Sequence, residues 1–391
     1  MIAPCNFGLE AVLKREIYDL GYEVTRVEDG RVTFEGDAEA VCRANIGLRT
    51  AQRVLIRIGS FQADSFEELF EETRALPWEE YLPENARFWI KKASVVKSVV
   101  KSIPDIQSVM KKAIVTRLSA VYRREQFPED GAEYPLRVFF YKDQVTIGLD
   151  TSGESLHKRG YRLLHGKAPI EETLAAGMIL LTPWKAGRVL ADFFCGSGTI
   201  PIEAAMIEGR VAPGLNRRFT ACDWTDLIDP KLWEDCFEEA REEAKTGIRE
   251  SLERQKDRRG RAHIYGSDRD EAIIRAARQN AKRAGVDRLI DFHACPVAEV
   301  RGEEWYGAFG FLISNPPYGE RMGEEDEVRQ LYRDVRTALM RLPTWSAWLI
   351  SSYSGLEHEL GKKAGKKRKL YNGMLRTDYY SFPGPKPPGR Q

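Results

Sequence analysis

The feature that most constrains the fold is a strand, a glycine loop and a helix placed in succession near the middle of the chain. The apolar run 189–194 predicts a buried parallel strand. Cys195-Gly196-Ser197-Gly198-Thr199 follows it, and a helical pattern begins at Ile200. Because glycine carries no side chain, such a loop lets a ligand approach the backbone closely. The order predicts the start of a nucleotide-binding α/β unit.

The loop indicates which nucleotide is bound. A dinucleotide fingerprint requires a third Gly or Ala where this chain has Pro201, and no Gly-Lys-Ser/Thr ending marks a phosphate loop. These departures disfavour a nicotinamide-dependent oxidoreductase. A ligand with an adenosine half and no phosphates fits better, and S-adenosylmethionine is the obvious candidate. Cys195 is expected to be a small packing residue and not a nucleophile.

A tetrapeptide, Asn315-Pro316-Pro317-Tyr318, follows the apolar run 309–313, which predicts another buried strand. The Asn315 side-chain oxygen and a backbone carbonyl held by the prolines can both accept hydrogen bonds from an NH2 group. Accepting both protons aims the lone pair of a delocalised amine. The Tyr318 ring offers a face on which a base can stack. The pattern favours methylation of an exocyclic amine, although Asn-Pro is also an ordinary turn signal.

An acid between these motifs completes the predicted cofactor site. Residues 263–268 read as the next strand, which ends in Asp268. An acid at this position can accept hydrogen bonds from both ribose hydroxyls. Asp is also favoured at helix N-caps, and the helical spacing of 274–284 follows closely, so Asp268 could serve either role. Asp270 is the more ordinary cap.

Length and composition bound the remaining possibilities. A chain of 391 residues predicts two or three domains. We find neither a run of about 18 apolar residues nor a signal-peptide pattern. The six cysteines are scattered without a Cys-x-x-Cys pair, which argues against a metal site and a disulfide scaffold. A protein of the reducing cytoplasm, with no metal and no membrane partner, is expected.

Basic residues are unevenly distributed although the formal net charge is only +1. The segment 91–124 is rich in Lys and Arg, and its part 97–122 has helical apolar spacing, which predicts a helix with a basic face. Such a face is often merely solvated, but beside a base-methylating motif it favours phosphate binding. A second basic run, 362–369, could steer nucleic acid toward the active-site mouth.

The chain divides near residues 150–165. The first part shows α+β patterning: helices near 9–20 and 66–76, strands near 32–34, 54–58 and 88–90, and a hairpin of 136–141 with 145–149. After residue 185 strands and helices alternate, which predicts a mostly parallel sheet. A helix is expected near 328–339 and a strand at 347–350, and residues 376–382 are expected to close the sheet. The charged segment 209–262 reads as a helical insertion on its rim.

With these motifs in hand, the sequence resembles the THUMP-domain class I methyltransferases that modify the exocyclic amine of a guanine in large-subunit ribosomal RNA. The resemblance covers nearly the whole chain. It is carried by five segments besides the motifs above: 3–10, 49–54, 150–162, 168–176 and 369–373. The most specific runs from Asp150 through His157-Lys158-Arg159-Gly160-Tyr161-Arg162, similar to the family's exit from the THUMP domain. The segment 168–176 resembles the family's helix over the cofactor.

The resemblance implies a fold and a domain division. The fold is a Rossmann-like class I methyltransferase with a seven-stranded, mostly parallel sheet whose last-inserted strand is antiparallel. An α+β ferredoxin-like and THUMP region precedes it and binds RNA. The expected domains are 1–62 (ferredoxin-like), 63–155 (THUMP) and 156–385 (methyltransferase, with the insertion 209–262).

The expected site residues follow from the motifs and the resemblance together. Asn315, Pro316, Pro317 and Tyr318 are expected to be catalytic. S-adenosylmethionine is expected to contact Asp192, Cys195, Gly196, Ser197, Gly198, Thr199, Asp268 and Asn315. RNA is expected to contact Lys91, Lys92, Lys97, Lys101, Lys111, Lys112, Arg159, Lys366 and Lys367. In the expected reaction the base is flipped out of the RNA and no covalent enzyme intermediate forms.

Two departures from the family pattern are visible. Phe193 follows Asp192 where the family usually has proline, and the run 291–296 lacks the acid that often contacts adenine, so no residue is assigned to adenine. The motifs alone leave transfer RNA, adenine or a protein glutamine open as substrates, and also a non-catalytic RNA-binding module. The RNA-binding first half disfavours a protein substrate, and the intact Asp192, Gly196, Gly198, Asp268 and Asn315 disfavour loss of catalysis.

Overall fold

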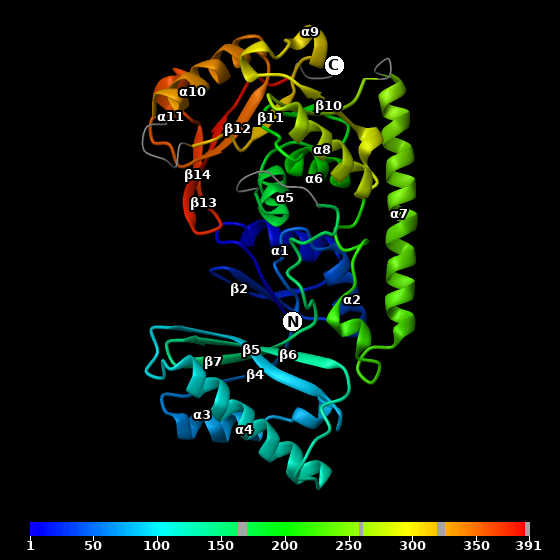
Figure 1. Cartoon of the computed structure of the whole chain (residues 1–391), viewed down its shortest axis with the longest axis vertical. Coiled ribbons are helices and arrows are strands. Elements are labelled where there is room, and N and C mark those ends of the chain that lie inside the picture. Colours follow the sequence, from blue (N-terminus) through cyan, green and yellow to red (C-terminus); the bar gives the residue numbers. More distant parts are fainter. Residues whose placement is uncertain (163–169, 258–260, 319–324, 388–391) are drawn as a thin grey trace.

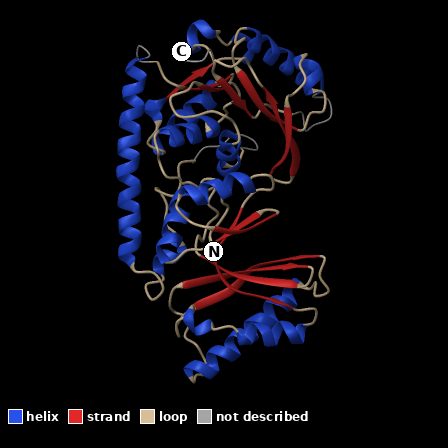
Figure 2. Ribbon diagram, turned by 180° about the vertical axis from the view of Figure 1, so that it is seen from behind, coloured by secondary structure: helices blue, strands red, loops and turns tan. Residues whose placement is uncertain are grey.

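Two seven-stranded sheets organise the chain, one in each half (Figure 1). A computed structural model describes residues 1–162, 170–257, 261–318 and 325–387. The first sheet lies in the part of the chain before residue 151, and the second lies after residue 189. Figure 2 shows helices on both sides of the second sheet, whereas the first sheet carries a helical layer at the end of the molecule farthest from the second. The chain thus passes from the first sheet to the second between Asp150 and Leu190, a stretch that includes the predicted division near 150–165.

The first sheet is continuous across the ferredoxin-like and THUMP regions, in the order β2-β3-β1-β4-β7-β6-β5. Strand β4 joins the two parts, because it pairs with β1 through Leu55 and with β7 over most of its length. The strands are β1 Ile2–Pro4, β2 Val24–Glu28, β3 Arg31–Phe34, β4 Leu55–Gln62, β5 Arg87–Val96, β6 Glu133–Tyr141 and β7 Gln144–Asp150. The predicted hairpin is present as β6 and β7.

Helices α1 Glu10–Asp19 and α2 Ala38–Gly47 belong to the ferredoxin-like part, and α3 Phe66–Ala75 and α4 Ile103–Tyr122 cover the THUMP strands. Buried Leu69 of α3 and Met110 and Ile114 of α4 join Phe140 and Ile147 of the sheet in one apolar core. The basic helix begins at Ile103 and not at residue 97, because β5 continues to Val96 and Lys97 adopts a positive φ of 53°. Lys97 and Lys101 therefore lie in the connection between β5 and α4.

The second sheet has the order β10-β9-β8-β11-β12-β14-β13. Strands β8 to β12 are parallel neighbours, and β14 is antiparallel to both β12 and β13. The strands are β8 Leu190–Asp192, β9 Ile264–Asp268, β10 Ile290–Ala294, β11 Phe311–Ser314, β12 Ser346–Ser351, β13 Lys366–Asn372 and β14 Leu375–Phe382. The predicted antiparallel strand is confirmed. However, β14 does not close the sheet: it inserts between β12 and β13, and β13 forms the edge.

The two faces of the second sheet bury separate cores. One face packs with α5 Glu172–Leu180, α6 Thr199–Glu208 and α8 Glu271–Arg283, through residues such as Ile202, Ile274 and Ile313. The other packs with α10 Glu325–Met340 and α11 Leu356–Leu360, through residues such as Leu312, Tyr332 and Leu349. The alternation of Leu312 and Ile313 between the two cores explains why β11 is buried throughout and apolar up to its last residue, Ser314. Helix α9 Glu303–Tyr306 lies between β10 and β11.

The insertion 209–262 corrects the expectation of a helix confined to the rim of the second sheet. Helix α7, Pro230–Asp257, runs along one side of the molecule beside both halves (Figure 1). It packs against α2 of the ferredoxin-like part as well as against α6. The segment before α7 enters the first core: Trp224 is fully buried and stacks on Tyr134 of β6, with ring centroids 4.9 Å apart. The insertion therefore fastens the two halves together.

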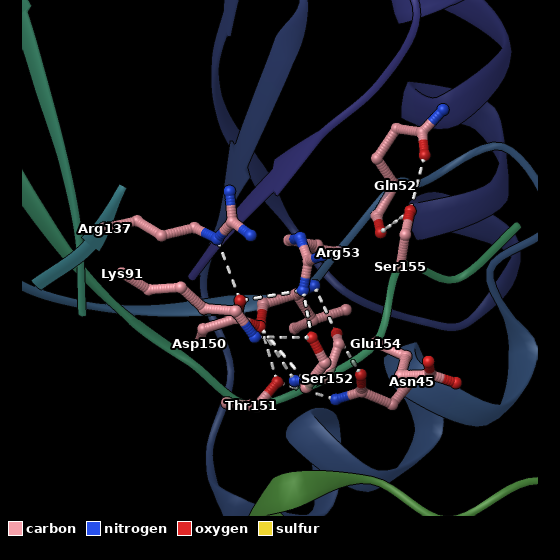
Figure 3. A network of polar contacts seen from close by, with 12 residues as sticks. Asn45, Gln52, Arg53, Lys91, Arg137, Asp150, Thr151, Ser152, Glu154 and Ser155 are labelled. Carbon is pink, nitrogen blue, oxygen red and sulfur yellow. Dashed lines mark hydrogen bonds and ion pairs between the residues drawn. The ribbon is translucent and has the colours of Figure 1, made fainter. Parts of the chain in front are cut away.

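A buried carboxylate fixes the exit from the first sheet. Asp150, at the end of β7, is completely buried, and its Oδ2 pairs with Arg53 and Arg137 at 2.8 Å each (Figure 3). Its Oδ1 accepts a hydrogen bond from the Ser152 backbone at 3.2 Å. Paired and hydrogen-bonded on both oxygens, this buried charge is compensated. The connection to the second half is held in one conformation at this point.

None of the helices in the described parts of the chain is both long enough and apolar enough to cross a membrane. Among the same residues, no group of three or more His, Cys, Asp or Glu side chains is arranged to hold a metal ion.

Candidate active site

The glycine loop lies at the carboxyl end of β8, where the predicted turn is confirmed. Gly196 and Gly198 have φ values of 51° and 89°, in the left-handed region that favours glycine. The turn is fastened by the Gly198 amide, which donates to the Cys195 carbonyl at 2.8 Å. A Cβ atom at Gly196 would meet no neighbour within 4 Å, whereas one at Gly198 would crowd Ala277 and Phe292. Gly196 therefore leaves the loop open to a ligand, and Gly198 allows α8 to pack closely.

Asp192 connects two strands at the edge of the site. Its carboxylate is buried and accepts hydrogen bonds from the Ser314 hydroxyl at 2.7 Å and the Phe194 amide at 3.0 Å. Burial raises the pKa of the Asp192 carboxyl to about 7, although these two hydrogen bonds oppose the shift. Because Ser314 immediately precedes Asn315, Asp192 holds the end of β11 against the end of β8.

Asp268 lies at the carboxyl end of β9 and does not cap the following helix. Its Oδ2 accepts a hydrogen bond from the Gly196 amide at 3.2 Å, and its Oδ1 accepts one from the Asp270 amide at 3.1 Å. Asp270 is the N-cap of α8, accepting from the Ala272 amide at 2.8 Å, as predicted. A carboxylate has about four acceptor positions, so each Asp268 oxygen keeps capacity for one further donor. That capacity matches the two hydroxyls of a ribose.

The other side chains of the loop are buried within the protein. Cys195 is buried, and burial raises the pKa of its thiol well above its usual value, so it is no thiolate nucleophile. The Ser197 carbonyl accepts from the Asn280 amide group at 3.1 Å, and the Thr199 hydroxyl accepts from Arg162 at 3.0 Å. Ser197 and Thr199 are themselves buried. The loop can therefore address a ligand mainly through its backbone.

The Asn-Pro-Pro-Tyr motif directly follows β11 at the same edge of the sheet. Asn315 and Tyr318 are partly exposed, Pro316 is buried and Pro317 is exposed. The Tyr318 hydroxyl donates to the Asn315 side-chain oxygen. Asn372, the last residue of β13, donates from Nδ2 to the Tyr318 oxygen at 3.3 Å. These bonds tie the motif to the edge strand of the sheet.

A cavity of about 420 Å³ opens beside these residues. Its described lining is Phe193, Phe194, Asp268, Arg269, Pro296, Val297, Ala298, Asn315, Pro317, Glu327, Val328, Leu331 and Asp334. It thus brings together Asp268 and Asn315, the predicted ribose acceptor and the predicted amine acceptor. An apolar wall beside an open glycine loop and a carboxylate with free acceptor capacity fits an adenosyl ligand without phosphates. Asp192, Cys195 and Gly196–Thr199 are not part of this lining.

Several lining residues escaped the sequence reasoning. The segment Pro296–Ala298 lies just beyond β10, and the sequence had left its role open because it lacks the usual acid. Pro296 and Val297 offer an apolar surface where an adenine ring could pack. Val328 and Leu331 come from α10, whose amphipathic spacing predicted the helix but gave no sign that one face borders a cavity. Ala168 and Pro169 of the segment expected to cover the cofactor lie outside the described residues.

The prediction that Arg159 contacts RNA is wrong. Arg159 is only 2% exposed, and its guanidinium lies 3.5 Å from the Glu203 carboxylate of α6. Its other donors reach the Leu156 and Arg49 carbonyls. Arg49 belongs to the first half and in turn donates to the Val211 carbonyl at 2.9 Å. Arg159 therefore joins the two halves from inside and cannot reach a nucleic acid at the surface.

A second buried ion pair lies next to Arg159. Arg162 contacts Glu172 at 3.1 Å, and Tyr161 donates to Glu203 at 3.1 Å. Burial raises the pKa of the Glu172 carboxyl to about 7, with Arg162 acting against the shift. Since Arg162 also donates to Thr199, this pair connects the interdomain segment to the glycine loop. The unusual density of charged and aromatic residues in 157–162 was the available signal.

The other residues of the first half that were predicted to contact RNA are all exposed. Lys91, Lys92, Lys97, Lys101, Lys111 and Lys112 all lie on β5, on α4 or between them. Lys91 donates to the Gly153 carbonyl at 3.2 Å (Figure 3), and Lys111 pairs with Glu129 at 3.4 Å. A shallow hollow of about 500 Å³ between β5 and α4 is lined by Trp89, Ile90, Gln107, Ser108, Lys111, Lys112 and Val115. Ammonium groups beside the partly exposed Trp89 ring suit a nucleic-acid backbone and base.

Lys366 and Lys367 lie on the edge strand β13 of the second sheet, and both are exposed. Lys367 pairs with Glu357, and its ammonium lies 5.1 Å from the centre of the Tyr380 ring. Its charge is therefore partly compensated within the protein.

The sheet order, the glycine loop, the strand-end acid and the Asn-Pro-Pro-Tyr corner define a class I methyltransferase that uses S-adenosylmethionine. Family models match three successive parts of the chain: an RlmL ferredoxin-like domain at residues 1–55, a THUMP domain at 63–150 and an RMKL-like methyltransferase domain at 159–381. The chain therefore belongs to the THUMP-containing, RMKL-like methyltransferase family.

Relatives with matching architecture support this assignment. YpsC of Bacillus subtilis, whose name proposes an RNA methyltransferase, is 44% identical over 98% of this chain and 95% of its own length. Ribosomal RNA large subunit methyltransferase K/L of Syntrophotalea carbinolica is 34% identical over 98% of this chain, which spans 54% of that longer protein.

Solved structures share the same fold. SMU.472, proposed to be a methyltransferase and complexed with SAH, matches with a TM-score of 0.89 and 38% identity over 99% of this chain and 98% of its own. A Listeria monocytogenes protein, named as a predicted N6-adenine-specific DNA methylase, matches with a TM-score of 0.89 and 46% identity over 98% and 96% of the two chains.

Proposed function

We propose that the protein transfers a methyl group from S-adenosylmethionine to the exocyclic N2 amine of a guanine in 23S ribosomal RNA. The observation that carries the proposal is the placement of Asn315 at the end of β11, in the wall of the cavity that Asp268 also lines. An amide oxygen at this position can hold a substrate amine beside the cofactor. The THUMP domain and the name of the K/L relative support ribosomal RNA as the substrate.

The residues of the motif would act by positioning the substrate. Asn315 Oδ1 and the Pro316 carbonyl would accept the two N–H bonds of the amine, so that its lone pair points into the cavity. Tyr318 would stack on the flipped base. S-adenosylmethionine supplies a methyl group that is already activated on a sulfonium. Orientation can therefore provide much of the acceleration, up to roughly 7–11 kcal/mol for well-aligned reactants.

No general base is required before methyl transfer in this scheme. The Asp192 carboxylate is buried and accepts hydrogen bonds from Ser314 and Phe194, so it is not placed to take a proton from the substrate. Burial keeps Cys195 as a thiol. The Asn315 oxygen would keep its hydrogen bond to the amine while the surplus proton leaves to water. His157, considered from the sequence, has Nδ1 3.0 Å from the Ser155 hydroxyl in the interdomain segment, and burial lowers the pKa of its imidazole.

The test is transfer of a labelled methyl group to unmodified large-subunit RNA, followed by nucleoside analysis. We expect label in N2-methylguanosine, and loss of about 100-fold or more of the rate in an Asn315→Ala variant that still binds cofactor. Near-normal turnover of that variant would contradict the amine clamp. Label confined to transfer RNA would move the substrate class and leave the chemistry intact.

Methylation of an adenine N6 amine is the second candidate, because the same two acceptors hold either amine. It is favoured by the name of the Listeria relative, although that name specifies DNA. Label in N6-methyladenosine would select this alternative. The THUMP domain argues for RNA over DNA in both cases.

A further inference from the structure

An aromatic pair, one ring exposed and the other half-buried, lies near the proposed methyl-transfer site and belongs to none of the three apolar cores. Phe7, in the loop between β1 and α1, is 42% exposed. Its ring meets that of Tyr371 on β13 edge to face, with centroids 6.0 Å apart. The Lys369 ammonium lies 5.7 Å from the centre of the Phe7 ring and 5.1 Å from that of Tyr371. We call Phe7, Lys369 and Tyr371 the aromatic platform.

The backbone beneath the platform is rigid. Gly8 has a φ of 92°, and a Cβ atom there would lie 2.8 Å from the Lys369 carbonyl oxygen. The Gly8 amide donates to the Glu10 carboxylate at 2.9 Å, and the Gly8 carbonyl accepts from Arg368 at 3.1 Å. The loop of the first half is thus pressed against the edge strand of the second. Phe7 is held at a fixed place and yet keeps a large part of its ring in solvent.

The platform is linked by contacts to the Asn-Pro-Pro-Tyr motif. Tyr371 is followed by Asn372, whose Nδ2 donates to the Tyr318 oxygen at 3.3 Å. The link between the platform and Tyr318 is therefore short. Tyr371 of the platform and Asn372 are consecutive residues of β13, and Asn372 is hydrogen-bonded to Tyr318, the ring that would receive the flipped base. This edge of the sheet therefore offers a path along which an RNA strand could continue from a base stacked on Tyr318.

We infer that the aromatic platform binds a nucleotide flanking the target base, in a single-stranded stretch of the RNA substrate. An exposed ring offers a stacking surface to any base, and the Lys369 ammonium would meet the phosphate or the ring above it. Single-stranded nucleic acid is recognised by this combination of aromatic faces and cations. The inference rests on the proposed function for the identity of the polymer, and it makes the ferredoxin-like loop part of the substrate site.

The test is the affinity for a labelled, single-stranded oligoribonucleotide, measured by fluorescence anisotropy without cofactor. We expect Phe7→Ala to weaken binding about tenfold and Phe7→Tyr to preserve it, because tyrosine keeps the stacking face. Phe7→Leu retains apolar bulk without a ring and should behave like Phe7→Ala. Since the Phe7 ring is partly in solvent, these variants should fold.

Tyr18 provides a matched control. It is a similarly exposed aromatic residue, at 49%, and the Lys14 ammonium lies 5.5 Å from its ring centre. It stands near the far end of α1, roughly 15 Å along the helix from the platform loop. Tyr18→Ala should leave oligonucleotide binding unchanged. If RNA bound to any exposed aromatic ring beside a lysine, Tyr18→Ala would weaken binding as much as Phe7→Ala.

The outcomes separate the platform from the proposed function. Equal binding by the wild type and Phe7→Ala, or preserved binding by Phe7→Leu, would overturn the platform even if the wild type methylates RNA. Loss confined to Phe7→Ala and Phe7→Leu would support it, whichever amine the methyl-transfer assay identifies. Failure of the wild type to bind the oligoribonucleotide would also overturn it.

Discussion

The Tyr318 hydroxyl donates a hydrogen bond to the side-chain oxygen of Asn315. The oxygen that is proposed to receive the substrate amine is therefore already engaged by the ring that is proposed to stack on the base. Both roles require the same small rearrangement, in which Tyr318 turns away from Asn315 as the base enters. Asn372 is placed to keep the hydroxyl after this turn, because it already donates to the same oxygen.

Substituting Tyr318 tests this exchange. Tyr318→Phe keeps the stacking ring and removes the competing hydroxyl, so we expect near-normal kcat and a KM for RNA lowered by up to about tenfold, the equivalent of one net hydrogen bond. Tyr318→Ala should lose stacking and raise KM by a similar or larger factor. Steady-state methyl transfer measures both. A large fall in kcat for Tyr318→Phe would instead assign the hydroxyl a direct part in the reaction.

Asp268→Asn is expected to weaken binding of the cofactor and to leave the fold intact. The Asn oxygen can still accept from the Gly196 or Asp270 amide, but the charge that strengthens bonds to the ribose hydroxyls is lost. We expect the Kd for S-adenosylmethionine to rise at least about tenfold, since hydrogen bonds to charged groups are worth ~1.5–3 kcal/mol. Isothermal titration measures this rise. Asn315→Ala provides the opposite pattern, with binding kept and turnover lost.

The pH dependence of stability should respond to Asp192. Burial raises the pKa of its carboxyl to about 7 in the folded chain, from the ordinary value of 3.8. Between these values the folded state binds more protons than the unfolded state, so this group lowers stability as the pH rises from about 4 to about 7. Asp192→Asn removes the titration and can still accept the bonds from Ser314 and Phe194.

We therefore expect Asp192→Asn to gain stability relative to the wild type on going from pH 5 to pH 8, with an upper bound of about 3 kcal/mol. Thermal melts of both proteins at several pH values give the difference. The comparison isolates Asp192, because Glu172, whose pKa burial also raises to about 7, is present in both. A difference that stays constant with pH would contradict the assignment.

Trp224 should matter more to stability than its place in an insertion suggests. It is fully buried against Tyr134, and its indole Nε1 donates to the Glu133 carbonyl at 2.8 Å. Trp224→Ala should cost about 3–5 kcal/mol, the usual range for a buried tryptophan. Trp224→Phe, which keeps a stacking ring, should cost less. Thermal unfolding of the two variants and the wild type measures these losses of stability. Equal losses for Trp224→Ala and Trp224→Phe would show that stacking of the ring on Tyr134 does not contribute.

Local patterns predicted most of the fold. The glycine loop, the strand ending in Asp268 and the cap at Asp270 are decided by neighbouring residues, and all three are where the sequence placed them. The antiparallel strand came from the family resemblance, and the place of β14 between β12 and β13 was missed, because no local signal sets the order of strands. The path of α7 was missed for the same reason: its charged sequence shows a helix but not which partner its apolar stripe meets.

The candidate site was predicted less completely than the fold. Asn315 and Asp268 were proposed because their chemistry is tied to strand ends. The structure places both in the cavity wall, and their roles there stay predictions. Arg159 was assigned to RNA on charge and sequence context alone, whereas the fold pairs it with Glu203 in the interior. The apolar lining from Pro296–Ala298 and α10 could not be recognised, since apolar residues around a cavity look like core residues in a sequence.

The span of α7 has a consequence for which nucleotides the enzyme can modify. The helix has 28 residues, about 40 Å at the usual rise, and it packs against both halves. With Arg159 and Trp224 fixing the same junction, the protein sets the distance between the proposed RNA-binding surface and the proposed methyl-transfer site. The enzyme would then select a target nucleotide by its distance from the RNA element that the first half binds. Lengthening the RNA between that element and the target should abolish modification, even though every base at the target is unchanged.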